Sequence, residues 1–171
     1  HGSMIGWRAG HYSLWADKSI FVGRKAGEQS SGVTSSVVIG DEAGLSASGT
    51  ASLSHAVIIG SEAGSSVHGF DESNLIGRYA GYAASGGPDS RSNLIGFGAG
   101  RYASGVQNSN LIGVNAGYGS LNISQSLIIG NSAGLEVSGA IGSNMIGTQA
   151  GTYADTANYS NVIGFQAALN A

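Results

Sequence analysis

The sequence predicts an all-β fold, a parallel β-solenoid, and three observations predict it. A short glycine-containing motif recurs ten times along the 171 residues at nearly constant spacing. The repeat is too short for a helical hairpin, and its apolar positions do not follow the 3.6-residue period of an amphipathic helix. Its two glycines would each cost about 1 kcal/mol inside a helix, whereas glycine suits tight turns because it adopts positive φ without steric cost.

The motif consists of two large apolar residues, Gly, two variable residues, Ala and Gly. Its copies read MIGWRAG, FVGRKAG, VIGDEAG, IIGSEAG, LIGRYAG, LIGFGAG, LIGVNAG, IIGNSAG, MIGTQAG and VIGFQAA. The first glycines are 17 residues apart, except for one spacing of 20 and one of 19, where extra residues fall within 48–55 and 85–91. Insertions confined to one part of a repeat are typical of loops on one side of a solenoid. After Gly6 in the first copy, we expect turns at Gly23, Gly40, Gly60, Gly77, Gly96, Gly113, Gly130, Gly147 and Gly164.

One repeat per coil makes residues 4–171 a single β-solenoid domain of about ten 17-residue coils. Coils stacked about 4.8 Å apart give a rod about 48 Å long. The residues seven and ten positions after the first glycine are mostly small or apolar, which predicts two further inward-facing positions in each coil. Residues 1–3 are typical of an expression-tag remnant, and the absence of polar capping repeats predicts that the chain is a fragment of a longer fibre.

Composition argues against several classes of function. Charged residues make up 10% of the chain, the net charge is −3 and Lys and Arg form no run, so we expect no nucleic-acid partner. No apolar run approaches the length of a membrane span, and we expect no membrane insertion. The chain contains no cysteine, which excludes disulfides and thiolate metal sites.

The sequence offers little that would support catalysis. Outside the tag remnant, His11, His55 and His68 lie in three different repeats, and the acidic residues are scattered. A catalytic triad or a metal centre needs such groups close together. We therefore expect a protein that is not an enzyme, with no metal site and no cofactor.

The paired apolar residues of the motif point to an assembly. Neighbouring side chains on a strand face opposite sides, so one member of each pair fills the coil and the other faces outward. Ten outward apolar residues would form a larger patch than a soluble monomer usually exposes, and we expect a parallel homotrimer to bury it. The alternative is that both side chains enter one wide core. The interface candidates are one member of each of the pairs Leu75 and Ile76, Leu94 and Ile95, Leu111 and Ile112, Ile128 and Ile129, and Met145 and Ile146.

The two variable positions of the motif differ from copy to copy, which indicates an exposed edge. Stacked coils would place Arg24 or Lys25 over Asp41 or Glu42, and Glu62 near Arg78. Tyrosines also gather at and just after the motif, where they could stack on a sugar; the alternative is that they pack over turns or against a neighbouring chain. The candidate ligand contacts are Tyr79, Tyr82, Asp89, Arg91 and Tyr102.

The segment SNLIGxxAG, present at 73–81, 92–100 and 109–117, resembles repeats of trimeric phage tail-fibre proteins and fibre-like bacterial surface proteins. It is more distantly similar to the head repeats of trimeric autotransporter adhesins. The resemblance runs from Met4 to Ala168. It implies parallel trimers on a virion or cell surface, outside the cell, that present loops to receptors, which are often glycans. The 17-residue period differs from that of the adhesin heads, so neither handedness nor any functional residue is carried over.

These observations favour a structural or adhesive fibre segment that presents or itself forms a receptor-binding surface. An ice-binding β-solenoid is the alternative, but it would need a ladder of Thr or similar residues on one exposed column. Thr occurs five times, and we expect no exposed column to be uniform. An acyltransferase built on hexapeptide repeats is less favoured, because its coil has 18 residues with a six-residue subperiod.

Overall fold

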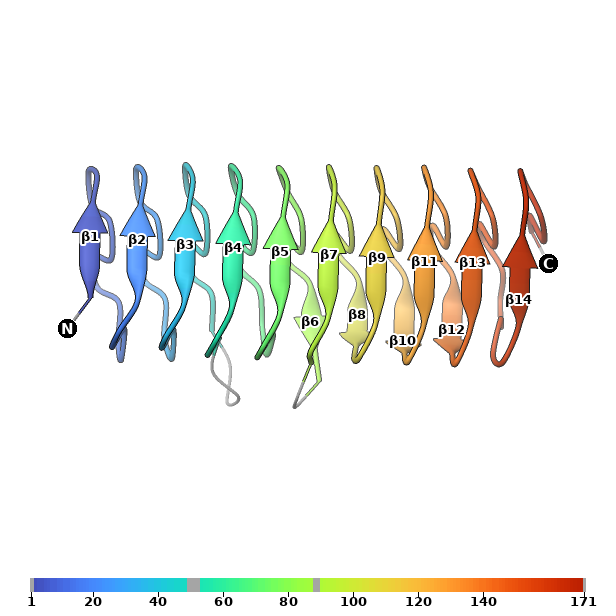
Figure 1. The fold of residues 1–171 in the computed structure, drawn as a ribbon, viewed down its shortest axis with the longest axis horizontal. Helices are drawn as coiled ribbons and strands as arrows, with labels where there is room; N and C mark the ends of the chain where they lie inside the picture. Colours follow the sequence, from blue (N-terminus) through green and yellow to red (C-terminus); the bar gives the residue numbers. More distant parts are fainter. Residues whose placement is uncertain (1, 49–52, 88–89, 171) are drawn as a thin grey trace.

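The computed structural model describes residues 2–48, 53–87 and 90–170, and in these ranges the chain forms a stack of parallel β-coils without a helix (Figure 1). Ten strands of three residues each lie side by side in one parallel sheet. In sheet order they are β1 (Ser3–Ile5), β2 (Ile20–Val22), β3 (Val37–Ile39), β4 (Val57–Ile59), β5 (Asn74–Ile76), β7 (Asn93–Ile95), β9 (Asn110–Ile112), β11 (Leu127–Ile129), β13 (Asn144–Ile146) and β14 (Asn161–Ile163). The predicted parallel β-solenoid is confirmed. Its ten strands, however, have nine complete turns between them rather than ten.

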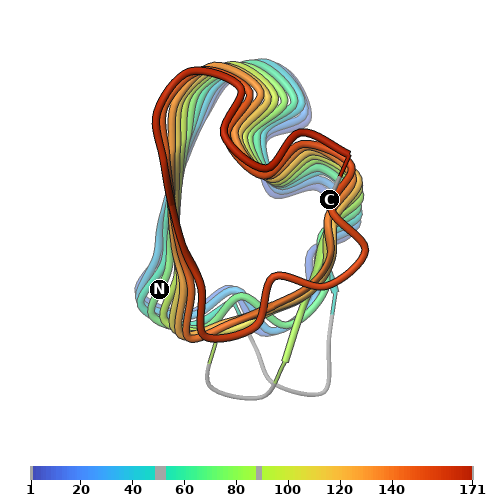
Figure 2. The same cartoon turned by 90° about the vertical axis from the view of Figure 1, so that its right-hand side faces the viewer.

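A second, shorter sheet forms on the returning half of the coils. Its strands are β6 (Ser85–Gly86), β8 (Ser104–Val106), β10 (Leu121–Ser124) and β12 (Ser138–Ile141), again all parallel. These strands lie behind the ten-stranded sheet and point the opposite way along the coil (Figure 1). The view along the axis shows the two sheets on different sides of one closed coil (Figure 2).

The strands pair without a register shift in the ten-stranded sheet, so each motif position forms a column along the axis. Leu111 of β9 pairs with Leu94 on one side and with Ile128 on the other. Backbone N–H and carbonyl groups of each coil form hydrogen bonds with the neighbouring coils. The N–H of Gly113, for example, donates to the carbonyl of Ile95 at 2.8 Å. A 17-residue sequence period is thereby converted into straight rows of like side chains.

The core is built from four of these columns. The first apolar residue of each motif is buried from Phe21 onward, and the motif Ala is buried from Ala26 to Ala150. The position seven residues after the glycine is buried from Ser30 to Ala154, as predicted. The position ten residues after it is buried at Val33, Phe70, Val106, Ile123, Ala140 and Ala157.

The two coils with insertions depart from this prediction. Thr50 lies outside the described residues, and Leu53 is the buried apolar residue of its coil. Gly87 is only half-buried, and Ser90 occupies the interior of its coil instead. The extra residues therefore shift the core position toward the next strand. The described residues that flank both insertions lie near the amino ends of the strands, on one side of the solenoid (Figures 1 and 2).

The first glycine of the motif allows the coils to stack closely. From Gly6 to Gly164 this column has φ between 128° and 141°. A Cβ on Gly113 would lie 2.4 Å from the carbonyl oxygen of Gly130 in the next coil. A side chain at this position would therefore collide with the backbone of the next coil, except at Gly164 in the last copy of the motif.

A column of mostly buried serines precedes the strands of the large sheet from β2 to β14, except at β4. The hydroxyl of Ser109 accepts a hydrogen bond from the N–H of Ser126 at 3.1 Å and donates to the carbonyl of Gln107 at 2.7 Å. Most coils repeat this arrangement, because a buried hydroxyl needs a partner both as a hydrogen-bond donor and as an acceptor. The column comprises Ser19, Ser36, Ser73, Ser92, Ser109, Ser126, Ser143 and Ser160, with Ala56 in the third coil as the exception.

Candidate functional site

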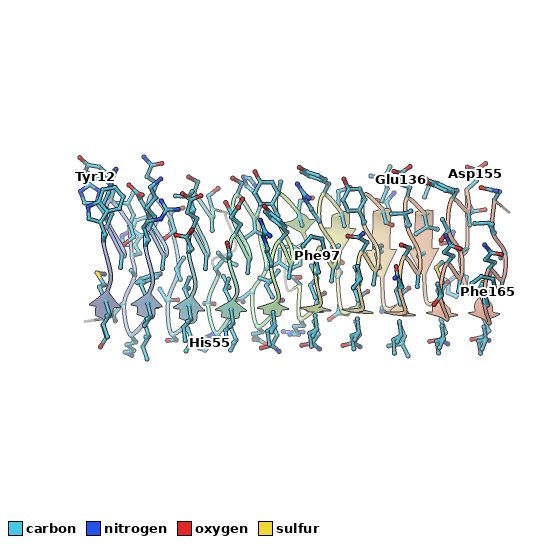
Figure 3. All side chains as sticks on the ribbon, turned by 90° about the horizontal axis from the view of Figure 1, so that it is seen from above. Tyr12, His55, Phe97, Glu136, Asp155 and Phe165 are labelled. Atoms are coloured by element: carbon cyan, nitrogen blue, oxygen red, sulfur yellow. The ribbon has the colours of Figure 1, made fainter. Side chains whose placement is uncertain are left out.

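The outer face of the ten-stranded sheet carries a continuous apolar column. The second residue of each motif pair points away from the core, and 36% of Ile39 and 37% of Ile59 are exposed. Figure 3 shows regular rows of side chains along the outside of the strands. We call this column the isoleucine face: Ile5, Val22, Ile39, Ile59, Ile76, Ile95, Ile112, Ile129, Ile146 and Ile163.

The position of this column shows which member of each predicted interface pair faces outward and which lies in the core. The outward members Ile76, Ile95, Ile112, Ile129 and Ile146 are all partly exposed. Their partners in the core are Leu75, Leu94, Leu111, Ile128 and Met145, each fully buried. The alternative in which both side chains enter one wide core is therefore wrong.

A second outward column runs beside the isoleucine face, two residues earlier in each strand. Its early members, Ile20, Val37 and Val57, are apolar, whereas asparagine dominates from β5 onward. The Nδ2 of Asn74 donates to the Oδ1 of Asn93 at 2.6 Å, and Asn93 donates in the same way to Asn110 at 2.7 Å. Such amide ladders are typical of identical residues stacked in register. Neither outward column contains a charged residue.

Charged side chains lie instead at the turns that follow strands β1 to β5. The Nε of Arg24 lies 2.7 Å from Asp41 Oδ1, and Lys25 Nζ lies 3.1 Å from Glu42 Oε1. The hydrogen bond that Arg24 donates to the Asp41 carboxylate raises the pKa of the Arg24 guanidinium above its ordinary value. This pairing between coils was predicted and is confirmed.

The expected pairing of Glu62 with Arg78 is wrong. Among the described residues, Arg78 makes no ion pair, and its Nη2 donates to the Oη of Tyr79 at 3.0 Å. Its guanidinium carbon lies 4.7 Å from the centre of the Tyr79 ring. Stacking on the neighbouring ring therefore replaces the predicted ion pair.

Three of the predicted ligand contacts come together at this edge. The rings of Tyr79 and Tyr82 meet edge to face with centroids 5.8 Å apart, and Tyr82 meets Tyr102 in the same way at 5.7 Å. Phe97 contacts Tyr79 at 5.8 Å, and Tyr118 contacts Tyr102 at 5.7 Å. The aromatic surface thus spans three successive coils.

Arg101 lies among these rings, and its role was not predicted. Its guanidinium carbon is 4.6 Å from the Tyr79 ring centre, 5.3 Å from Tyr82 and 4.8 Å from Tyr102. Its Nη2 donates to Tyr102 Oη at 3.0 Å, while its Nε is buried without an acceptor among the described residues. We call Tyr79, Tyr82, Phe97, Arg101, Tyr102 and Tyr118 the aromatic–arginine cluster. Arg101 could have been found in the sequence, because it occupies the same repeat position as Tyr82 and Tyr118.

The other two predicted ligand contacts do not join this cluster. Arg91 lies just before β7 and its Nε is 3.0 Å from Glu72 Oε2, whereas Tyr79 follows the carboxyl end of β5. In a parallel sheet these positions lie at opposite ends of neighbouring strands (Figure 1). Asp89 lies outside the described residues.

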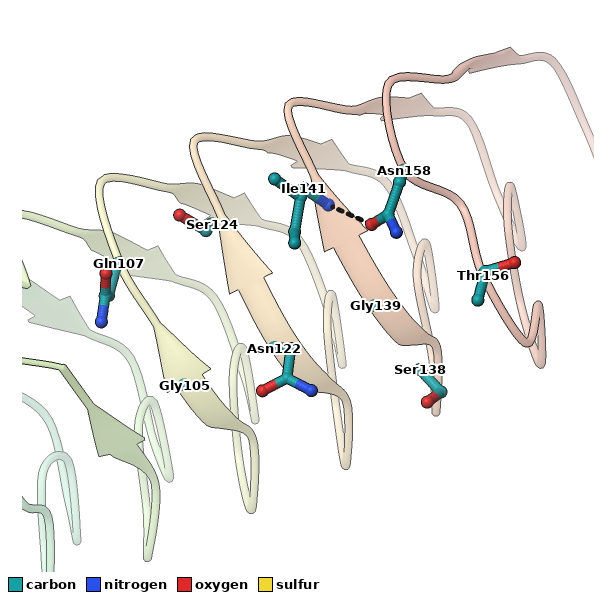
Figure 4. A pocket seen from close by; sticks show the side chains of 9 residues that line it. All are labelled: Gly105, Gln107, Asn122, Ser124, Ser138, Gly139, Ile141, Thr156 and Asn158. Atoms are coloured by element: carbon teal, nitrogen blue, oxygen red, sulfur yellow. Dashed lines mark hydrogen bonds between the residues drawn. The ribbon is translucent and has the colours of Figure 1, made fainter.

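The second sheet carries an open groove of about 480 Å³ on its outer side (Figure 4). Gly105 and Gly139 have positive φ and no side chain, which hollows the surface on both sides of Asn122. None of the groove residues is charged. They are Gly105, Gln107, Asn122, Ser124, Ser138, Gly139, Ile141, Thr156 and Asn158.

Within the described ranges, no three His, Asp or Glu residues lie close enough together to hold a metal ion. In the same part of the chain, no helix is long and apolar enough to cross a membrane. The only ion-pair partner found for a histidine there is Glu28, whose Oε1 lies 3.7 Å from His11 Nδ1.

The fold and these surfaces define the chain as a parallel β-solenoid repeat protein with a 17-residue period. Comparison with known proteins finds no matching family model, no matching curated protein and no matching solved structure.

Proposed function

We propose that this protein is a structural and adhesive fibre segment, located outside the cell on a virion or cell surface. Three copies lie parallel and bury their isoleucine faces against one another. The turn edge, which carries the aromatic–arginine cluster, then faces outward and contacts a receptor such as a glycan. The proposal gives the chain no catalytic role.

The isoleucine face is the observation that carries this proposal. Nine isoleucines and one valine form an unbroken outward column, and neither this column nor the outward column two residues earlier contains a charged residue. An exposed apolar patch of this extent is typical of a protein interaction surface. In a parallel assembly each coil would meet the same coil of its neighbours, so the column would match itself along its whole length.

The aromatic–arginine cluster supports the receptor-contacting part of the proposal. Tyr102 is 44% exposed and Phe97 45%, so their rings are accessible at the edge of the coil. Among the described residues neither Arg78 nor Arg101 makes an ion pair, which leaves both cations to interact with a ligand. Aromatic rings and guanidinium groups together are suited to stacking and hydrogen bonding with sugars.

Molar mass in solution tests the assembly. Light scattering after size-exclusion chromatography should give three times the chain mass of 17.0 kDa, about 51 kDa. Ile112→Asp places a charge in the buried face and should shift the particle toward 17.0 kDa while the circular dichroism spectrum is retained. Val114→Asp is the matched control, because it adds the same charge at an exposed turn position where another coil already has Asp41. A wild-type chain that stays monomeric at 100 µM would overturn the assembly.

Ice binding is a second candidate, and one observation now favours it more than the sequence did. The expectation that no exposed column is uniform is wrong, because the isoleucine face is both exposed and nearly uniform. It contains no Thr, however, so it lacks the hydroxyls expected of an ice-binding ladder. Thermal hysteresis of the wild-type chain, abolished by Ile112→Asp and retained by Val114→Asp, would replace the fibre proposal.

A further inference from the structure

The groove on the second sheet contains polar groups that the fold does not use. The side chains of Gln107, Asn122, Ser124, Ser138 and Thr156 make no hydrogen bond to any described residue. Elsewhere on the solenoid, outward amides bond to one another from coil to coil, and buried serines bond to backbone. The groove is therefore a place where several donors and acceptors are left free and face one hollow (Figure 4).

Eight of the nine groove residues form two rows along the solenoid axis, and each row has one residue from each of four coils. One row contains Gln107, Ser124, Ile141 and Asn158, and the other contains Gly105, Asn122, Gly139 and Thr156. Successive members are spaced by the coil repeat of about 4.8 Å. A ligand that repeats along its own length at a similar spacing would place one unit against each coil.

One side chain of the groove is already held in place. Asn158 Oδ1 accepts a hydrogen bond from the N–H of Ile141 at 3.0 Å, the contact drawn in Figure 4. This bond fixes the amide and leaves its Nδ2 as a donor. Tyr159 follows directly, and its ring is 80% exposed and lies beside Gly142 at the end of β12.

The chemistry of the groove selects among ligand classes. Its lining contains no Lys, Arg, His, Asp or Glu, so nothing in it would compensate a charged ligand. Its amides and hydroxyls can both donate and accept, which matches the hydroxyl groups of a sugar. Ile141 and the exposed Tyr159 ring offer apolar surface for the C–H face of a pyranose. A peptide is less suited, because the edge strand β12 is already covered by the next coil, whose Ala157 N–H donates to the carbonyl of Gly139 at 2.9 Å.

We propose that this groove binds a neutral, extended oligosaccharide that lies parallel to the solenoid axis. The groove and the isoleucine face lie on different sides of the coil, so the groove stays open in the proposed assembly (Figure 2). The inference extends the receptor-contacting part of the proposed function. Its test measures binding by the chain itself, so its failure would leave the assembly untouched, and failure of the assembly would leave the groove untouched.

A glycan array with neutral and anionic oligosaccharides, followed by NMR titration of the ¹⁵N-labelled chain, tests the proposal. The NMR probes are cellotetraose, maltotetraose and the tetrasaccharide of N-acetylglucosamine. We expect retention of neutral glycans on the array. With at least one of the three probes, we expect chemical-shift changes at Asn122, Ser124 and Asn158.

Asn122→Gly should weaken binding five- to tenfold, which is the size expected for one lost hydrogen bond. Glycine already occupies this column at Gly105 and Gly139, so the fold should be retained. Ser124→Ala is a second variant that keeps its backbone conformation. Asn115→Gly is the matched control, because Asn115 has the same φ of 53° as Asn122 and lies at the turn edge in a column that contains Gly98.

Three results would overturn the proposal. The first is no binding of a neutral oligosaccharide on the array or at millimolar concentration of the NMR probes. The second is unchanged affinity in both Asn122→Gly and Ser124→Ala. The third is binding at another site or of another class, seen as chemical-shift changes confined to the aromatic–arginine cluster or as retention of anionic glycans only.

Discussion

Leu111 and Ile112 are adjacent in strand β9 and face opposite sides of the sheet. Leu111 is fully buried and stacks between Leu94 and Ile128, whereas Ile112 is partly exposed and stacks between Ile95 and Ile129. Strand alternation in a sheet of stacked coils thus turns one sequence motif into two columns. One column fills the coil, and the other forms the isoleucine face.

Truncation of the two residues should therefore have different effects. Leu111→Ala removes buried carbon atoms and leaves a cavity, so we expect a loss of about 2–5 kcal/mol in the free energy of unfolding. Ile112→Ala should cost the single chain about 1 kcal/mol or less, because the side chain is already partly solvated. Urea denaturation at a concentration where the chain is monomeric measures both. Equal losses for the two variants would contradict the assignment of the columns.

The glycine column should be far less tolerant than the glycines elsewhere. Gly113→Ala places a Cβ 2.4 Å from the carbonyl oxygen of Gly130 at a φ of 135°, and we expect a loss of about 3 kcal/mol or more. Gly119→Ala is the matched control, because its φ of 65° lies in a column where Ala83 already adopts a φ of 50°. Its loss should be about 1 kcal/mol or less. Thermal unfolding of the two variants in parallel distinguishes them, and similar midpoints would contradict the close stacking at Gly113.

The aromatic–arginine cluster should stabilise the edge of the coil as well as present a surface. Tyr82 and Tyr102 meet edge to face at 5.7 Å with ring planes at 88°. A double-mutant cycle with Tyr82→Ala and Tyr102→Ala should give a coupling energy of about 0.5–1.5 kcal/mol. The same cycle for Tyr82 and Tyr153, which lie several coils apart, should give a coupling near zero. A zero coupling for the contacting pair would show that the rings do not support each other.

The fold class and the repeat register could be predicted from the sequence because one short motif recurs at a fixed spacing. The core positions of the two irregular coils could not. Pattern alone does not say where the extra residues enter, so Leu53 and Ser90 were not identified as interior residues. The buried serine column was also missed, because serine is ordinarily a surface residue and its pairing becomes visible only when successive coils are stacked.

The sequence did contain a signal for the outward column that was not used. Asn74 precedes Leu75 and Ile76, and a polar side chain at the start of a strand is expected to face water. Alternation from Asn74 then places Leu75 inside and Ile76 outside, as the structure has them. The groove offered no comparable signal, because its residues are common polar types whose free hydrogen-bonding groups depend on the coil geometry. The separation of Arg91 from the tyrosines likewise follows from the direction of the strands.

Removing a hydroxyl from the serine column should lower the stability of the fold, and adding one should raise it. Ser109→Ala leaves the buried N–H of Ser126 without its acceptor, so we expect a loss of about 1–3 kcal/mol in stability and faster hydrogen exchange at the Ser126 amide. Ala56→Ser adds a hydroxyl at the one position between Ser19 and Ser160 that lacks it and should supply an acceptor for the Ser73 amide, with a gain of about 0.5–1.5 kcal/mol.

Urea denaturation and amide exchange measured on both variants test this pair of expectations. Ser61→Ala is the control, because the Ser61 hydroxyl lies at the turn edge without a hydrogen bond to a described residue, and its effect should stay within about 0.5 kcal/mol. A destabilising Ala56→Ser would mean that packing requires the smaller Ala56 side chain. Its coil differs from the others because it contains the extra residues that fall within 48–55. A stabilising Ala56→Ser would show that the hydroxyl-to-amide contact between coils strengthens the stack wherever serine supplies it.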